Sequence, residues 1–196
     1  MSLLRNVDPT RYSHRTYIIS EGDELSGLKA REIERGLQSK YGQALFQPTE
    51  AGETNSITGK WNMKFVPRAR EIHQPLSTTP MSSYRCFMEC RKALGSPSAE
   101  AYPDVVITNG PATAVMVILA AIWLKFFGVA PVGKLMIIYV ESWAMVKTLS
   151  LSGRILLSMG VCDEFLVQWE YLAKSCNESW WSSFRQKVKW NGFLVE

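Results

Sequence analysis

The sequence predicts an α/β fold, in which a Rossmann-like parallel sheet carries helices on both faces. Three apolar, β-branched runs at residues 104–108, 135–140 and 164–168 predict buried strands, and helical segments separate them. This alternation is typical of a parallel sheet covered on both sides. The 196 residues are enough to bury a substantial core, and we expect a single domain over residues 1–196.

The beginning of the chain is predicted to contain a helix, a strand and a second helix. Residues 1–8 already read as part of a helix. Residues 16–20 are β-branched and aromatic between two turn sequences, which predicts a strand. Residues 26–36 are charged and carry apolar side chains at roughly helical spacing, so they predict a surface helix.

The middle of the chain is less regular. Residues 40–60 mix Gly, Pro, Thr and Asn, which predicts a loop with some irregular strand. A short strand is expected at residues 62–66, ending at Pro67. Residues 82–94 carry apolar side chains on one side and predict an amphipathic helix.

Three more helices are predicted in the second half. Residues 112–127 are strongly apolar and are closed by Gly128. Because a membrane span needs roughly twenty residues, we interpret this segment as a buried crossover helix, and a helix touching a bilayer with one face is the alternative. Residues 149–159 predict a further helix, and a short one follows from Trp169.

Composition narrows the class of protein. The chain is 46% hydrophobic and 20% charged, as folded globular proteins are. Its net charge of +4 is too small and dispersed to indicate nucleic-acid binding, yet it leaves room for a local anionic ligand. The four cysteines form no CxxC pair and the two histidines lie far apart, so we expect no disulfide framework, metal or cofactor.

The turn after the strand at residues 104–108 is the first candidate ligand site. It contains Asn109, Gly110, Pro111 and Thr113. Ligands of open parallel sheets bind at the carboxyl ends of strands, and the following helix N-terminus offers N–H groups to a phosphate. The alternative is a tight strand–helix turn with Pro in the first helical turn.

Glu141 and Ser142 follow the next strand, at the same edge of the predicted sheet. A carboxylate there could accept sugar hydroxyls or act as a base, and a helix-capping or solvent-facing Glu is the alternative. Nearby, Ser150, Ser152 and Arg154 would suit a diphosphate. The pattern itself favours a structural role instead, a helix N-cap with an exposed arginine.

A basic loop forms the third candidate site, with Arg68, Arg70, Glu71 and His73. Such a loop could clamp an anionic headgroup or lie against a negatively charged membrane, and a solvated charged face is the alternative. His73 has no Ser, Cys or Asp partner at an interpretable spacing, so no catalytic triad is predicted.

The C-terminal part of the chain is rich in tryptophan, which suits either core filling or an interface. The last apolar residues are Phe193, Leu194 and Val195, and we expect this end to dock on another surface.

Several strings of the sequence together resemble one family. They are ITNGPAT, IIYVESWAMVKTLSLSGRIL, FLVQW, FVPRAREIHQ, TYIISEGDELS and the terminal NGFLV. They resemble the membrane-anchor subunit of the asparagine-linked-glycosylation UDP-N-acetylglucosamine transferase of the dolichol pathway. The match covers most of the chain, and its longest string is specific.

The resemblance implies a split GT-B glycosyltransferase in which this chain is the N-terminal, acceptor half and a separate catalytic subunit supplies the UDP-sugar half. Together they would add the second GlcNAc to GlcNAc-diphospho-dolichol on the cytosolic face of the endoplasmic reticulum membrane, which is continuous with the nuclear envelope. The chain alone would be inactive and would recruit the catalytic subunit. The first-step GlcNAc-phosphate transferase is a further partner to consider, and a self-sufficient nucleotide-sugar-dependent glycosyltransferase is the alternative function.

The resemblance also implies roles for the candidate residues. Asn109, Gly110, Pro111 and Thr113 would line the cleft, and Glu141 with Ser142 would lie beside them. The loop around Arg68 would lie near the acceptor or the membrane, and the C-terminal tail would dock on the partner.

The start of the chain departs from the family pattern. Family members begin with an apolar membrane anchor, a strand and a glycine-rich loop ending in a histidine, and the first residues here resemble the helix that follows this loop. We therefore expect the sequence to be a truncated gene model, rather than a working short form, that lacks the anchor, the first strand and the loop.

Overall fold

The structure is a computed structural model that describes residues 7–9, 11–42, 60–69, 79–95, 102–110, 112–131, 133–178 and 188–192. The chain divides into two compact units. The first comprises Met1–Phe65 with Val195–Glu196, and the second comprises Val66–Leu194. The single domain expected over residues 1–196 stays a prediction.

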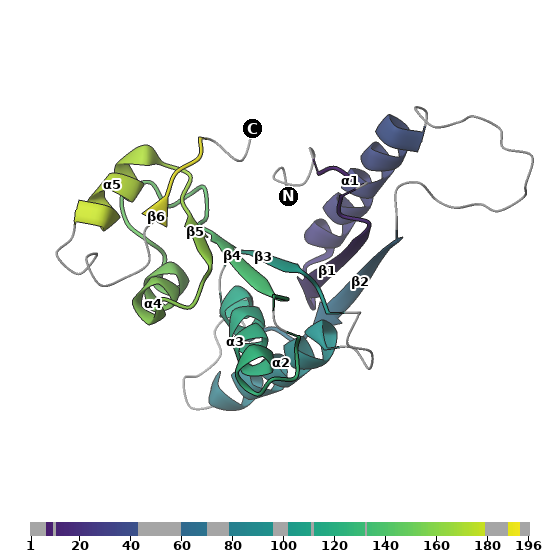
Figure 1. Ribbon diagram of the computed structural model, residues 1–196, viewed down its shortest axis with the longest axis horizontal. Coiled ribbons are helices and arrows are strands. Elements are labelled where there is room, and N and C mark those ends of the chain that lie inside the picture. The colour runs from purple at the N-terminus through teal and green to yellow at the C-terminus, as the bar shows by residue number, and fades with distance from the viewer. Residues whose placement is uncertain are drawn as a thin grey trace, which may run out of the picture. The chain divides into compact units, whose positions relative to one another are not determined.

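The second unit contains a four-stranded parallel sheet in the order β3-β4-β5-β6 (Figure 1). Its strands are β3 (Val105–Asn109), β4 (Met136–Val140), β5 (Glu164–Leu166) and β6 (Val188–Lys189). Neighbouring strands of the order β3-β4-β5 are joined by helical crossovers, as parallel pairing requires. The α/β class predicted from the alternation is therefore confirmed.

Four helices lie in the described part of this unit. They are α2 (Thr79–Leu94), α3 (Ala112–Phe126), α4 (Leu151–Met159) and α5 (Glu170–Glu178). Helices α2 and α3 pack against each other, and α3 also contacts β3 and α4 (Figure 1). Seven of the fifteen residues of α3 are buried, with Ile118, Ala120 and Ala121 fully inaccessible, and the helix joins β3 to β4, as the predicted crossover helix does.

The core of the second unit is aromatic at its centre. Tyr139 of β4 and Phe165 of β5 are both fully buried, and their ring centroids lie 5.0 Å apart. Leu156 of α4 and Leu172 of α5 are also buried to at least 98%. Burying side chains of this size is the main stabilising contribution to such a sheet–helix layer.

The two-residue strand β6 is held in part by a side chain, because it is too short for many backbone hydrogen bonds. The amide of Asn177 donates from Nδ2 to the carbonyl of Val188 at 2.8 Å and accepts from the Val188 N–H at 3.0 Å. The carboxamide therefore replaces backbone pairing beside β6 and closes the end of α5 against it.

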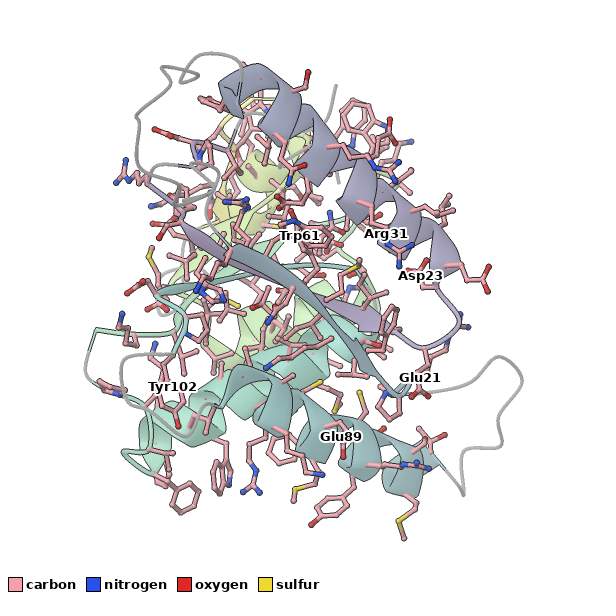
Figure 2. The ribbon with its side chains drawn as sticks, turned by 90° about the vertical axis from the view of Figure 1, so that its right-hand side faces the viewer. Glu21, Asp23, Arg31, Trp61, Glu89 and Tyr102 are labelled. Atoms are coloured by element: carbon pink, nitrogen blue, oxygen red, sulfur yellow. The ribbon has the colours of Figure 1, made fainter. Side chains whose placement is uncertain are left out.

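The first unit contains β1 (His14–Ser20), α1 (Glu24–Gly42) and β2 (Lys60–Val66), whose last residue falls in the second unit. Asp23 caps α1 by accepting from the backbone N–H of Ser26 at 3.1 Å (Figure 2). Trp61 lies on β2 near α1 (Figure 2) and packs against a small core that includes Tyr17 and Ala30.

A buried ion pair strengthens this unit. The Glu34 carboxylate is 1% exposed and accepts from Nε and Nη2 of Arg15 at 2.8 and 2.7 Å, and from the Tyr17 hydroxyl at 2.6 Å. Burial raises the pKa of Glu34, but the hydrogen bonds from Arg15 and Tyr17 outweigh this effect and hold that pKa below its ordinary value. Burial and the same carboxylate raise the pKa of Tyr17.

The predicted elements agree with the observed ones, with shifts at their ends. Helix α1 is longer than the predicted residues 26–36, and α2 begins three residues before the predicted residue 82. Residues 1–6 and 43–59, with most of the predicted first helix and loop, lie outside the described residues. None of the helices in the described ranges combines the length and apolar character that a membrane span requires.

Candidate functional site

The carboxyl ends of β3 and β4 lie side by side. The strand register pairs Asn109 with Val140, so Asn109 and Gly110 lie beside the residues that lead into Glu141 and Ser142. The backbone N–H of Glu141 donates to the Leu166 carbonyl at 2.8 Å, which ties this edge to β5 as well. The predicted placement of both turns at one sheet edge is confirmed.

The β3–α3 turn is sharp and open. Gly110 has φ +115°, in the region that favours glycine, and no atom lies within 4 Å of the position that a β-carbon would take. Asn109 is exposed and Thr113, in the first turn of α3, is half-buried. The first N–H groups of a helix lack intrahelical partners, so this turn could receive an anionic group. Pro111 lies outside the described residues.

The β4–α4 connection is built around the Glu141 carboxylate, which is 1% exposed. Its Oε1 accepts from the Ser142 N–H at 2.9 Å, and its Oε2 accepts from the N–H and the hydroxyl of Ser150 at 3.1 and 3.0 Å. Both oxygens thus meet donors of this chain. In this arrangement Glu141 holds the connection in place, and a chemical role for it remains a prediction.

Ser150 is the N-cap of α4. Its backbone is extended, with φ −60° and ψ 162°, and its Oγ accepts from the Gly153 N–H at 3.0 Å. The N-cap interpretation of this segment is confirmed. At the start of α4, Glu141 and Ser150 thus accept from the N–H groups of Ser150 and Gly153. The Glu141 carboxylate is the anionic group that the helix dipole favours at this position, so no bound ligand is needed there.

The other residues of that segment are less enclosed. Ser152 is half-buried in the first turn of α4, and Arg154 is exposed. Both lie one helical turn or less from the capped N-terminus, so a diphosphate could still meet them from solvent, and this role stays a prediction.

Tyr139 completes the network from inside the sheet. Its hydroxyl lies 3.5 Å from Glu141 Oε1 and 3.4 Å from Ser150 Oγ. Burial, opposed by the Ser150 hydrogen bond and assisted by the Glu141 charge, raises the pKa of Tyr139 to about 12. The phenol therefore stays protonated at neutral pH and acts as a hydrogen-bonding group.

Two tryptophans cover the same edge of the sheet. Trp143 follows Ser142, and Trp169 follows β5, with their ring centroids 4.8 Å apart at an interplanar angle of 45°. The indole Nε1–H of Trp169 donates to the Trp143 carbonyl at 2.9 Å. The sequence analysis gave Trp169 as the start of a helix and as part of the tryptophan-rich C-terminal region, but did not pair it with Trp143, because no spacing rule connects residues 26 positions apart.

The remaining predicted residues are dispersed or undescribed. Arg68 is half-buried just after β2. The other three residues of the basic loop, Arg70, Glu71 and His73, and the tail residues Phe193, Leu194 and Val195, lie outside the described residues. The described ranges contain no group of three His, Cys, Asp or Glu side chains that could hold a metal ion.

Comparison with known proteins assigns the chain to a family. The family model described as "Oligosaccharide biosynthesis protein Alg14 like" matches residues 1–184. The UDP-N-acetylglucosamine transferase subunit alg14 of Aspergillus fumigatus is 35% identical over a 236-residue alignment that covers 100% of this chain and 99% of the relative. The subunit of the same name from Schizosaccharomyces pombe is 35% identical over 178 residues, which cover 88% of this chain and 70% of the relative.

The likeness extends to animals. The Mus musculus UDP-N-acetylglucosamine transferase subunit ALG14 is 33% identical over 169 residues, covering 86% of this chain and 68% of the relative. No solved structure matches the chain. With a family match over residues 1–184 and relatives at 33–35% identity, the chain belongs to the Alg14-like oligosaccharide biosynthesis family.

Proposed function

We propose that the chain is a subunit of a UDP-N-acetylglucosamine transferase that acts in N-glycan precursor synthesis. The observation that carries this proposal is the similarity to curated subunits of that name over 86% or more of the chain. In this role the chain recruits a catalytic subunit to the endoplasmic reticulum membrane. The complex then adds the second GlcNAc to GlcNAc-diphospho-dolichol.

The carboxyl edge of β3 and β4 is the acceptor side of the proposed cleft. The open turn at Gly110 lets a diphosphate approach the backbone at the start of α3, and the exposed amide of Asn109 can hydrogen-bond sugar hydroxyls. Beside this turn, Glu141 fixes Ser142 and the β4–α4 connection through hydrogen bonds of 2.9–3.1 Å. This edge would form only the acceptor side of the cleft. A second chain is then needed to supply the side that binds the nucleotide sugar.

The proposal makes this subunit inactive by itself. In the described ranges, the carboxylate at the candidate site is enclosed and occupied by its own loop, and no histidine accompanies it. General acid–base chemistry needs a group within hydrogen-bond reach of the substrate proton. Such a group would come from the partner, whose docking we assign to the apolar tail of Phe193, Leu194 and Val195.

The exposed end of α3 suits contact with a lipid surface. Phe126, Phe127 and Val129 are 82%, 59% and 46% exposed, and the two phenylalanine rings lie 5.3 Å apart. Aromatic side chains next to basic residues favour the interfacial region of a membrane, and Lys125 precedes this pair. We propose that this end of α3, where Lys125 also contacts Leu135 and Asp163 just before β4 and β5, lies against a lipid surface at the edge of the sheet opposite the Gly110 turn.

Transfer assays with separate and combined subunits test the proposed function. This chain, the catalytic subunit and their mixture are each given UDP-GlcNAc and GlcNAc-diphosphate carried on a short prenyl chain. We expect a disaccharide-diphosphate product only from the mixture. Product from this chain alone would instead favour a self-sufficient glycosyltransferase, and no product from a mixture that co-purifies as a complex would contradict the proposal.

A further inference from the structure

The exposed tryptophan at the carboxyl edge of β4 has a geometry that suits a sugar. Trp143 is 44% exposed, three residues beyond the last residue of β4, at the edge where parallel sheets bind ligands. Its indole offers a flat, electron-rich face. A pyranose ring carries a face of C–H groups whose partial positive charge and apolar surface complement such a face.

The loop that carries Trp143 is fixed on both sides of the indole. Before it, the Ser142 N–H donates to Glu141 Oε1 at 2.9 Å, and the Met145 N–H donates back to the Ser142 carbonyl at 3.0 Å. From the segment between β5 and α5, the Trp169 indole N–H donates to the Trp143 carbonyl at 2.9 Å. These bonds hold the backbone of Trp143, and the Trp169 ring packs against its indole with centroids 4.8 Å apart, so the indole loses little conformational freedom when a ligand contacts its exposed part.

Polar groups at the neighbouring strand ends favour a sugar over a lipid or an apolar peptide. Asn109 is exposed and is level with Val140, the last residue of β4. Ser142, directly before Trp143, is half-buried. An amide and a hydroxyl at the same sheet edge as an exposed indole suit the two surfaces of a pyranose, one apolar and one rich in hydroxyl groups.

We propose that Trp143 is the platform on which the sugar of the glycosyl-diphosphate acceptor stacks, and that Trp169 is a positioning residue that holds this platform. The proposal rests on the transferase function proposed above and adds a specificity-determining contact to it. It predicts that the indole face, rather than the diphosphate turn at Gly110, distinguishes an acceptor with a sugar from one without.

Steady-state kinetics of the reconstituted complex test the proposal. We expect Trp143→Ala to raise the acceptor KM about tenfold and to leave the KM for UDP-GlcNAc unchanged, since one aromatic stacking contact contributes about that factor. Trp143→Phe keeps a ring and should raise the acceptor KM only about twofold to threefold. Trp169→Phe removes the N–H that holds the loop and should give an intermediate value. Tyr84→Ala, an aromatic truncation at a 60% exposed site on α2, is the matched control and should change neither KM.

Binding measurements with two probes separate stacking from diphosphate recognition. GlcNAc-diphosphate on a short prenyl chain should bind the Trp143→Ala complex about tenfold more weakly, whereas the prenyl diphosphate without sugar should bind wild type and variant equally. Three results would overturn the proposal. Trp143→Ala could weaken the binding of both probes equally, or could leave the acceptor KM of an active complex unchanged. Trp143→Phe could fail to co-purify with the catalytic subunit. Absence of transfer by the wild-type complex would overturn the proposed function itself.

Discussion

Gly153 of α4 lies against the Glu141 carboxylate so closely that a β-carbon at position 153 would overlap Glu141 Oε2. The same position would also come within 3.2 Å of the Ser150 hydroxyl. A glycine inside a helix normally lowers stability relative to alanine. Here it gives the carboxylate room to reach both Ser142 and Ser150, so the glycine belongs to the candidate site.

Replacing this glycine should therefore destabilise the protein. Gly153→Ala displaces a carboxylate that makes three hydrogen bonds of 2.9–3.1 Å, and we expect the free energy of unfolding to fall by about 2–4 kcal/mol. Gly36→Ala is the matched control, because it lies in α1 with no atom within 4 Å of the added carbon. It should stabilise the chain by about 0.5–1 kcal/mol. Urea unfolding measures the free energy of unfolding of both variants. Equal changes in the two variants would contradict the close approach of Gly153 to the Glu141 carboxylate.

Glu141→Gln should be damaging although it preserves size. Each carboxylate oxygen accepts a backbone N–H, from Ser142 at Oε1 and from Ser150 at Oε2. An amide has one acceptor end, so its NH₂ group would face a backbone donor in either orientation. We expect a loss of about 2 kcal/mol in the free energy of unfolding and a fall in kcat of the reconstituted complex. Full stability with a lost kcat would instead show that Glu141 acts chemically.

The buried Arg15–Glu34 pair predicts a pH dependence in the first unit. The pKa of Glu34 is lowered in the folded protein, so its contribution to stability is complete above the ordinary Glu pKa of about 4.3 and is lost as the pH falls through the lower folded value. Glu34→Gln should cost about 3 kcal/mol at pH 7 and progressively less below about pH 4. Unfolding measured by circular dichroism across this range gives both differences.

A surface pair provides the control for that experiment. Glu89 lies on the outer side of α2 (Figure 2) and pairs with Lys92 at 2.8 Å, with 40% of its side chain exposed. Glu89→Gln should change the free energy of unfolding by less than about 1 kcal/mol at either pH. A cost at Glu34 that stays constant between pH 7 and pH 3.5 would contradict the assignment of the stability to the ionised carboxylate.

Removing the exposed aromatics of α3 should weaken membrane contact. The double variant Phe126→Ala/Phe127→Ala deletes two side chains that are 82% and 59% exposed, and we expect at least tenfold weaker co-sedimentation with vesicles of phosphatidylcholine and phosphatidylinositol. Leu25→Ala/Leu28→Ala removes apolar side chains of similar exposure, 63% and 61%, from α1 and should have no effect. If both double variants bind vesicles as the wild type does, the proposed contact at α3 is wrong.

Regular elements with clear boundaries could be predicted from the sequence. The apolar helix was placed within one residue of Ala112–Phe126, because its side chains are apolar throughout and Gly128 follows it. The strand at Val105–Asn109 was found because β-branched residues precede an Asn-Gly turn. A helix N-cap was the favoured interpretation of the segment with Ser150, Ser152 and Arg154, and the structure places the cap at Ser150.

Contacts between distant residues could not be predicted. Glu141 and Ser150 are nine positions apart, so the sequence left capping, solvent exposure and chemistry open as roles for the carboxylate. The role of Gly153 depends on that contact and has no local signature. Strand β6 has two residues and is held by the side chain of Asn177, which produces no hydrophobic periodicity.

The central claim is that this chain supplies the acceptor side of a cleft shared by two subunits. The most direct test is the acceptor and donor KM of the reconstituted complex carrying Asn109→Ala, with Gln38→Ala on the exposed side of α1 as the matched amide control. We expect Asn109→Ala to raise the KM for GlcNAc-diphosphate on a short prenyl chain about fivefold to tenfold, with the KM for UDP-GlcNAc and both control values unchanged. A rise in the UDP-GlcNAc KM with an unchanged acceptor KM would contradict the account.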